Sequence, residues 1–216
     1  MKFLDRDIIK SINEDLLMEA LTHSSYSNEH KDSKNYERLE FLGDAVLELI
    51  TSEYFYQNTS FKEGEMTKKR ASFVCEQALS HYARDLGIDK LIRVGHGQIG
   101  NVNDTIIADV FESVLGAIYL THGLDIAKEY INEIIIPYIK KDFMFLGDYK
   151  TLLQEYVQTD RKSLEYVLVK EYGEAHNKTF EVEVKIDNII YGRGIGKSKK
   201  EAEQNAAFDA YKKSAK

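Results

Sequence analysis

The sequence predicts two compact units of different class: an all-helical unit followed by a small α+β unit with the order α-β-β-β-α. Two patterns predict this division. Apolar residues recur at three- and four-residue steps through the first two thirds of the chain, which is helical spacing. In the last third they alternate with polar residues, which is strand spacing. The 216 residues, 43% of them hydrophobic, are enough to fill two cores.

The helical unit is expected to cover residues 1–146. Helical spacing runs through the segments 13–22, 36–57, 67–86, 104–121 and 125–140. No convincing alternating strand interrupts them. Pro137 lies near the end of this unit, and the stretch from Lys140 to Gly147 has the composition of a short connector. The boundary is therefore predicted near residue 147.

The second unit is expected to cover residues 147–216. Its predicted elements are a helix at about 148–158, strands at Leu164–Lys170, Thr179–Ile186 and Ile189–Gly194, and a helix at Lys199–Lys213. The middle strand alternates apolar and charged residues, which predicts an antiparallel sheet with one buried face. Alanines at 202, 206 and 210 recur every four residues, so the last helix can approach that sheet closely.

The distribution of charge assigns any phosphate-binding role to the second unit. The net charge of −7 argues against a nucleic-acid partner for the chain taken as a whole. Residues 147–216, however, hold 13 Lys+Arg against 12 Asp+Glu, whereas residues 1–146 hold 16 against 24. Phosphate binding is therefore expected in the second unit.

Cysteine content and the amino terminus indicate a soluble cytoplasmic protein. Cys75 is the single cysteine, so no internal disulfide can form, and no Cys/His spacing resembles a zinc site. The start of the chain has no apolar run after basic residues, and the apolar stretches are expected to fall short of a membrane span.

Two pairs of acids lie in almost continuously apolar helical sequence. Asp109 and Glu112 are the only charged residues of segment 106–120, and their spacing puts both on one helical face. Glu40 and Asp44 lie four residues apart in a second such segment, and Glu37 extends that face by one turn.

Two interpretations of these acids compete. A single acid in a helix is more often part of an ordinary solvated face. Two pairs in apolar sequence would repel each other and be costly to desolvate unless a cation neutralised them. Mg²⁺ prefers carboxylate oxygens and can drive phosphodiester hydrolysis without His or Cys. A glycosidase acid–base pair is the other use of paired carboxylates, but two helical pairs suit it poorly.

A long motif then resembles a known family. The run Asn-Tyr-Glu-Arg-Leu-Glu-Phe-Leu-Gly-Asp-Ala-Val-Leu at 35–47 closely resembles the signature of the ribonuclease III family. Further segments, 21–26, 63–66 and 108–112, match the family in the expected order, and the tail from 148 to 202 is similar to a double-stranded-RNA-binding domain. The resemblance covers nearly the whole chain.

The resemblance implies an all-α endonuclease domain with a site that binds Mg²⁺, for which Mn²⁺ substitutes. The implied metal ligands are Glu40, Asp44, Asp109 and Glu112, with Asp44 and Glu112 catalytic, and Glu37 and Glu63 lie along the RNA path. The family acts as a homodimer, with Phe41 at the interface, and needs no membrane or small-molecule cofactor.

The implied reaction is hydrolysis of double-stranded RNA, which leaves 5′-phosphate and 3′-hydroxyl ends with short 3′ overhangs. The implied roles are RNA processing steps such as maturation of rRNA precursors and mRNA processing. Two departures are visible: Ser113 replaces the alanine usual after the glutamate, and the loop 95–104 lacks the basic residue common there. The second departure is expected to weaken RNA contact near the site.

The predicted RNA-binding residues lie in the second unit. The glycine run 192–196 fails the spacing of a phosphate loop, but Ser198 can cap the last helix, where lysines would meet phosphate. The expected contacts with RNA are Gln154, Glu155 and Gln158 on the first helix, His176 in the loop after the first strand, and Lys197, Lys199 and Lys200.

Three functional hypotheses follow. The first is an active, metal-dependent endonuclease for double-stranded RNA. The second is a non-cleaving regulator that binds double-stranded RNA on the same fold, which the intact set of acids disfavours. The third, a nucleotide-dependent enzyme that uses the glycine run, is the weakest because the loop spacing is wrong.

Overall fold

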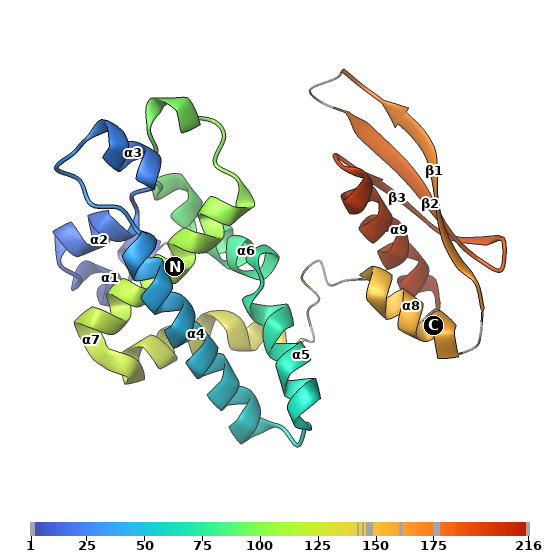
Figure 1. Cartoon of the computed structure of the whole chain (residues 1–216). Helices are drawn as coiled ribbons and strands as arrows, with labels where there is room; N and C mark the ends of the chain where they lie inside the picture. The colour runs from blue at the N-terminus through green and yellow to red at the C-terminus, as the bar shows by residue number, and fades with distance from the viewer. Residues whose placement is uncertain are drawn as a thin grey trace. The chain divides into compact units, whose positions relative to one another are not determined.

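The computed structural model describes residues 3–141, 143, 145, 149–159, 162–174 and 178–214, without the side chains of 151, 152, 155, 159 and 214. The chain forms two compact units, Met1–Phe145 and Leu146–Lys216 (Figure 1). The predicted boundary near residue 147 lies outside the described residues.

The first unit is helical, as predicted. Its elements are η1 (Phe3–Asp5), α1 (Asp7–Lys10), α2 (Glu14–Ala20), α3 (Ser24–Glu29), α4 (Glu37–Asn58), α5 (Glu63–Val74), α6 (Glu76–Leu86), η2 (Ile88–Leu91), η3 (His96–Gln98) and α7 (Asp104–Lys140). The helix expected over 67–86 is instead two helices, because Cys75 adopts an extended conformation between them (φ −73°, ψ 159°). No glycine or proline marks that break, so the apolar spacing concealed it.

The helix α7 forms the centre of this unit and packs against α2, α4 and α6. Its length and composition would allow it to cross a membrane, contrary to the expectation from sequence, but 61% of its most apolar window is buried inside the protein. A core helix enclosed by other helices is apolar on most of its faces. Gly123 interrupts the helical geometry (φ 80°), at the gap expected between segments 104–121 and 125–140.

The contact between α4 and α7 is unusually close because glycine stands on both helices. A β-carbon at Gly43 would lie 1.8 Å from the carbonyl oxygen of Glu112. A β-carbon at Gly116 would lie 2.4 Å from the carbonyl oxygen of Leu39. The two backbones are therefore in direct contact, and any side chain at either glycine would force them apart.

The second unit contains an antiparallel sheet and two helices in the predicted order α-β-β-β-α. Its elements are α8 (Tyr149–Thr159), β1 (Leu164–Tyr172), β2 (Thr179–Ile186), β3 (Ile189–Gly196) and α9 (Lys199–Ser214), and the strand order is β1-β2-β3. The face of β2 that carries Val182, Val184 and Ile186 is buried. Helix α9 packs on β2 and β3, and α8 packs on α9.

The glycine run of the second unit serves this packing. A β-carbon at Gly194 would lie 2.2 Å from the carbonyl oxygen of Ala202, and one at Gly192 would lie 2.3 Å from that of Ala206. The alanines at 202, 206 and 210 are fully buried, as their spacing predicted. The run lies within β3 and supports α9, which explains its composition without a bound nucleotide.

Candidate metal centre

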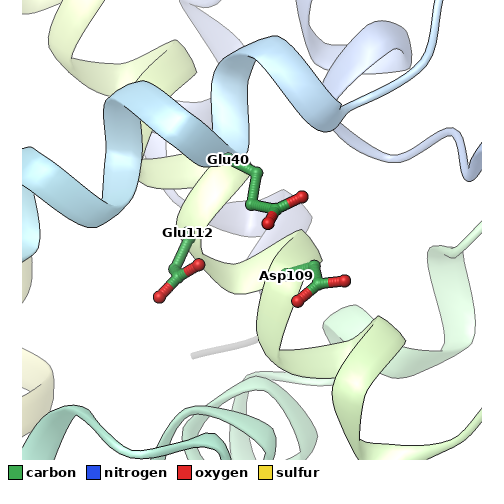
Figure 2. A group of neighbouring side chains, drawn as sticks. All are labelled: Glu40, Asp109 and Glu112. Carbon is green, nitrogen blue, oxygen red and sulfur yellow. The ribbon is translucent and has the colours of Figure 1, made fainter.

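Three carboxylates from two helices converge where α4 crosses α7. Glu40 projects from α4, and Asp109 and Glu112 project from α7 (Figure 2). One oxygen from each carboxylate lies within 4.8 Å of the others. The glycine contact between Gly43 and the backbone of Glu112 brings the two helices close enough for this grouping.

Ionisation of the three acids is unfavourable, because they are partly buried and lie close to one another. Burial, followed by the charges of Asp44 and Glu40, raises the pKa of Glu112 to about 8. Burial is also the main cause that raises the pKa values of Glu40 and Asp109. Clustered carboxylates with raised pKa values lack enough neighbouring positive charge to neutralise them. The ligand atoms that they offer are all oxygens. Both properties fit a hard divalent cation.

Tyr36 and His23 adjoin the acids, and sequence reasoning assigned no role to either in the site. The Tyr36 hydroxyl donates a hydrogen bond to Oδ2 of Asp109 at 3.0 Å. Burial, followed by the charge of Asp109, raises the pKa of Tyr36 above its usual range, so the hydroxyl keeps its proton. The hydrogen bond from Tyr36, and to a smaller degree the proximity of His23, oppose the rise that burial causes in the pKa of Asp109. The sequence offered no signal for this bond beyond the position of Tyr36 directly before Glu37, because 73 residues separate it from Asp109.

The other acids predicted for this site lie around the group. Asp44, one turn further along α4, is exposed and outside the three-residue group, although its charge acts on Glu112. Glu37 is exposed in the first turn of α4 and raises the pKa of Glu40. Glu63 is exposed at the start of α5, where it accepts a hydrogen bond from Thr67.

Comparison with known proteins identifies the family of both units. Residues 13–139 match the family model described as ribonuclease-III-like, and residues 149–214 match the double-stranded RNA binding motif. The chain is 45% identical to ribonuclease 3 of Bacillus cereus (strain G9842), over 98% of this chain and 89% of that protein. The chain belongs to the ribonuclease III family. It is also 46% identical to ribonuclease 3 of Bacillus cytotoxicus, over 93% of this chain and 85% of that protein.

A solved structure of the same family matches the helical unit. The nuclease domain of ribonuclease III from Campylobacter jejuni superimposes with a TM-score of 0.53 and 37% sequence identity, over 57% of this chain and 86% of that chain. The ribonuclease III family is metal-dependent, and its members are endonucleases that act on double-stranded RNA. The acidic group at the α4–α7 crossing is present in this member.

Several of the predicted RNA-binding residues of this ribonuclease III chain are exposed on helices of the second unit. Gln154 and Gln158 are exposed on α8, and Lys199 and Lys200 are exposed at the start of α9. Lys197, just before α9, is also exposed and donates to Thr179 Oγ1 at 3.4 Å. The side chain of Glu155 and the whole of His176 lie outside the described residues.

Ser198 caps α9, as predicted. Its hydroxyl accepts a hydrogen bond from the amide of Glu201 at 3.1 Å, and the Glu201 carboxylate accepts one from the amide of Lys197 at 2.6 Å. This reciprocal pair resembles a capping box and fixes the start of the helix that carries the lysines. The amino end of α9 therefore presents two exposed lysines in a defined position.

At both departures from the family pattern, the residues are hydrogen-bonded to neighbouring elements. Ser113 is fully buried, and its hydroxyl donates to the carbonyl oxygens of Ala20 at 2.6 Å and Val110 at 2.9 Å. The loop after Gly95 is held to α3, because Glu29 accepts hydrogen bonds from the His96 amide and pairs with its ring. Neither departure removes an acid from the α4–α7 crossing.

Proposed function

We propose that the chain is a Mg²⁺-dependent endonuclease that hydrolyses both strands of double-stranded RNA. The observation that carries the proposal is the group formed by Glu40, Asp109 and Glu112, whose carboxylate oxygens lie within 4.8 Å of one another. The pKa of Glu112, about 8, indicates that this group is short of positive charge. Mg²⁺ is the proposed ion, and Mn²⁺ should substitute because it accepts the same oxygen ligands.

Glu40, Asp109 and Glu112 would hold the ion, and Asp44 completes the proposed ligand set. Asp44 lies outside the close group, but Mg²⁺ usually keeps several waters, through which a nearby carboxylate can act. Asp44 and Glu112 are the proposed catalytic residues. A bound divalent ion supplies a hydroxide-like nucleophile at neutral pH and stabilises the leaving oxygen of a phosphodiester.

The second unit is proposed to bind the duplex by its shape. Gln154, Glu155 and Gln158 would contact one minor groove and His176 another, while the lysines at 197, 199 and 200 would contact the phosphates between them. The exposure of Lys199 and Lys200 at the capped start of α9 supports the proposed phosphate contacts.

In the first unit, Glu37 and Glu63 are proposed to lie along the RNA path beside the metal centre.

A homodimer is the proposed active form, with one metal centre for each strand. Phe41, Ala45 and Leu49 repeat every four residues along α4 and form an exposed apolar stripe. Phe41 is 82% exposed and Leu49 is 53% exposed, which is unusual for large apolar side chains next to an active centre. The report on the Campylobacter jejuni nuclease domain likewise concerns a region involved in dimer formation.

The proposed products are short duplexes with 5′-phosphate and 3′-hydroxyl ends and short 3′ overhangs. Cutting of structured precursors in the cytoplasm, including rRNA precursors and mRNA, is the proposed cellular role. No small-molecule cofactor is needed for this chemistry, because the ion and water supply it.

The proposal is tested by digestion of a defined RNA hairpin, with both ends of every product mapped. The wild-type chain should cut with Mg²⁺ and stop when the ion is chelated, and Glu112→Gln should reduce the cleavage rate about a thousandfold or more. Glu129→Gln is the matched control, because Glu129 is exposed in the second half of α7, beyond Gly123. Undiminished cleavage by Glu112→Gln would refute the proposed centre. A gel shift without products from the wild type would instead favour the non-cleaving regulator.

A further inference from the structure

We propose that Tyr36 is a positioning residue for the metal centre, which holds the carboxylate of Asp109 and the first turn of α4 in the geometry that receives the ion. The inference rests on the proposed function, because it assumes that Glu40, Asp109 and Glu112 bind the ion. It assigns a task to a residue that carries no charge and that does not itself ligate metal.

Tyr36 contacts both helices that supply the carboxylates. Its hydroxyl donates to Oδ2 of Asp109 on α7 at 3.0 Å. Its carbonyl oxygen accepts a hydrogen bond from the amide of Glu40 on α4 at 2.9 Å. The residue is only 3% exposed, so water does not compete strongly for either bond. One buried residue therefore bonds the Asp109 carboxylate directly and the backbone of Glu40, which carries a second carboxylate of the group.

Tyr36 is itself fixed from a third direction. Its amide donates to the carbonyl oxygen of Thr22 at 2.9 Å, in the turn between α2 and α3. Thr22 pairs with Arg93 in a parallel bridge, and the Arg93 amide donates to the carbonyl of Leu21 at 2.8 Å. The backbone of Tyr36 is thus anchored outside both ligand-bearing helices, and its ring is buried, so the hydroxyl has little freedom to follow the carboxylate if that side chain rotates.

A fixed donor is useful here because the acids repel each other when no ion is bound. Without a partner, the Asp109 carboxylate would lower that repulsion by turning away from Glu40. A carboxylate has about four lone-pair positions, so one hydrogen bond from Tyr36 leaves others for an ion. Hydrogen bonds that orient ligands in this way typically contribute about 10- to 100-fold to metal affinity.

A purely structural role for Tyr36 makes a different prediction. If the hydroxyl only satisfied its own need for a partner in a buried place, its removal would lower stability but would leave the ion affinity of the folded protein unchanged. Tyr36→Phe separates these roles, because it keeps the packed ring and removes only the hydroxyl. Tyr82→Phe is the matched control: Tyr82 is also buried, and its hydroxyl donates to the carbonyl of Phe73 at 3.2 Å.

The experiment measures Mn²⁺ binding to the full chain by electron paramagnetic resonance, without RNA. Tyr36→Phe should raise the Mn²⁺ dissociation constant about 10-fold, whereas Tyr82→Phe should leave it within about twofold of the wild-type value. Circular dichroism should show that both variants keep the wild-type helix content. In cleavage assays, Tyr36→Phe should require more Mg²⁺ for half-maximal rate, and saturating Mg²⁺ should restore most of that rate.

A second background tests whether Tyr36 acts through Asp109. In Asp109→Ala, the further change Tyr36→Phe should have no effect on the remaining Mn²⁺ affinity, because the hydroxyl has lost its carboxylate. An additional loss in that background would overturn the inference. Equal affinity of Tyr36→Phe and the wild type would overturn it too.

Failure of this inference can be told apart from failure of the proposed function. If Glu112→Gln loses Mn²⁺ binding while Tyr36→Phe keeps it, the metal centre stands and only the role of Tyr36 is wrong. If the wild type and Glu112→Gln bind Mn²⁺ alike, the metal centre is misplaced, and the inference falls with it.

Discussion

In the nuclease unit, backbone contact at Gly43 brings Glu40, Asp109 and Glu112 together. In the RNA-binding unit, backbone contact at Gly194 instead packs the alanine face of α9 on β3. Both contacts depend on glycine, since a β-carbon would overlap backbone atoms of the facing helix. The electrostatic results are opposite. The first unit concentrates partly buried negative charge, and the second leaves the positive charges of Lys199 and Lys200 exposed at the start of α9.

This difference indicates that the two units bind different partners. Partly buried acids repel one another, and a bound divalent ion relieves that repulsion, so the group favours cations. Exposed lysines keep their hydration and approach phosphate at long range, so their contribution to binding depends on salt.

The close contact beneath the metal centre should be the most sensitive point. Gly43→Ala places a β-carbon 1.8 Å from the carbonyl oxygen of Glu112, so α4 and α7 must separate. We expect the free energy of unfolding to fall by about 3–5 kcal/mol, with loss of Mn²⁺ binding. Urea unfolding followed by far-ultraviolet circular dichroism measures this loss.

The control for Gly43→Ala is Gly64→Ala in α5, where an added β-carbon would meet nothing within 4 Å. That change should be neutral or stabilising by up to about 1 kcal/mol, because alanine favours a helix more than glycine does. Equal unfolding midpoints for the two variants would mean that the α4–α7 contact is not as close as described, and the origin of the acid group would need another explanation.

Repulsion among the carboxylates at the α4–α7 crossing should make the stability of the chelator-treated protein depend unusually on pH. Burial and the neighbouring acids raise the pKa of Glu112 to about 8 in the folded state, from 4.5 for a free side chain. Between these pH values the folded state binds more protons than the unfolded state, so the free energy of unfolding falls as pH rises. We expect a loss of about 1–3 kcal/mol from pH 5 to pH 8.5, reduced by partial solvent screening.

Comparison with Glu112→Gln isolates this contribution. The amide cannot ionise, so the variant should lack that part of the decline and should be more stable than the wild type in chelator at pH 8.5. Saturating Mn²⁺ should stabilise the wild type most at high pH, where no proton has to be displaced. Parallel pH profiles for the two proteins would show that Glu112 ionises normally and that the acids are not short of positive charge.

The difference between the units also explains how much the sequence could predict. Helical spacing located α4 and α7, and acids set in apolar sequence pointed to Glu40, Asp109 and Glu112, which the structure brings together. Periodicity places residues on a face of one helix, but it does not say which helices cross. The convergence became an expectation only through the resemblance to a family.

Features that depend on tertiary contact could not be predicted in this way. The contact of Gly43 with α7 was missed because a glycine in a helix looks the same whether or not another backbone touches it. Tyr36 was missed because its hydrogen bond to Asp109 spans 73 residues of sequence. The break at Cys75 was missed because apolar spacing continues through it and neither glycine nor proline is present. In the second unit, by contrast, strand alternation and the alanine repeat were local patterns, and they predicted the packing correctly.

The exposed charges of the RNA-binding unit should act through salt-dependent contact. Lys199→Ala with Lys200→Ala should weaken binding to duplex RNA about 10-fold at physiological salt and reduce the slope of log affinity against log salt by about 2. Metal-dependent cleavage should survive at low salt, because neither lysine belongs to the metal centre. Filter binding at several salt concentrations measures both quantities.

A double variant at the other end of α9 controls for the loss of two charges. Lys212 and Lys213 are exposed in its last turns, so Lys212→Ala with Lys213→Ala removes the same charge from the same helix. Their loss should change affinity much less than the loss of Lys199 and Lys200. Equal effects would indicate that net charge, and not the capped start of α9, governs RNA binding.

The smallest effect is expected at Ser113, next to Glu112, where the buried polar group has its partners inside the protein. The Ser113 hydroxyl donates to the carbonyl oxygens of Ala20 and Val110 and is fully buried. Ser113→Ala should therefore lower the free energy of unfolding by about 1–2 kcal/mol, because the buried carbonyls lose the one hydroxyl proton that they share. Mn²⁺ affinity should not change, since this side chain points to α2 and not to the acids.

Thr121→Ala provides the comparison for Ser113→Ala, because Thr121 bonds the carbonyl of Ala117 at 2.8 Å on the same helix but is exposed. Water can replace its hydroxyl, so that change should alter stability by less than about 0.5 kcal/mol. A loss of Mn²⁺ affinity in Ser113→Ala would contradict the assignment of Ser113 to packing and of Glu112 to the metal centre. It would mean that the buried hydroxyl of Ser113 supports the carboxylate of Glu112.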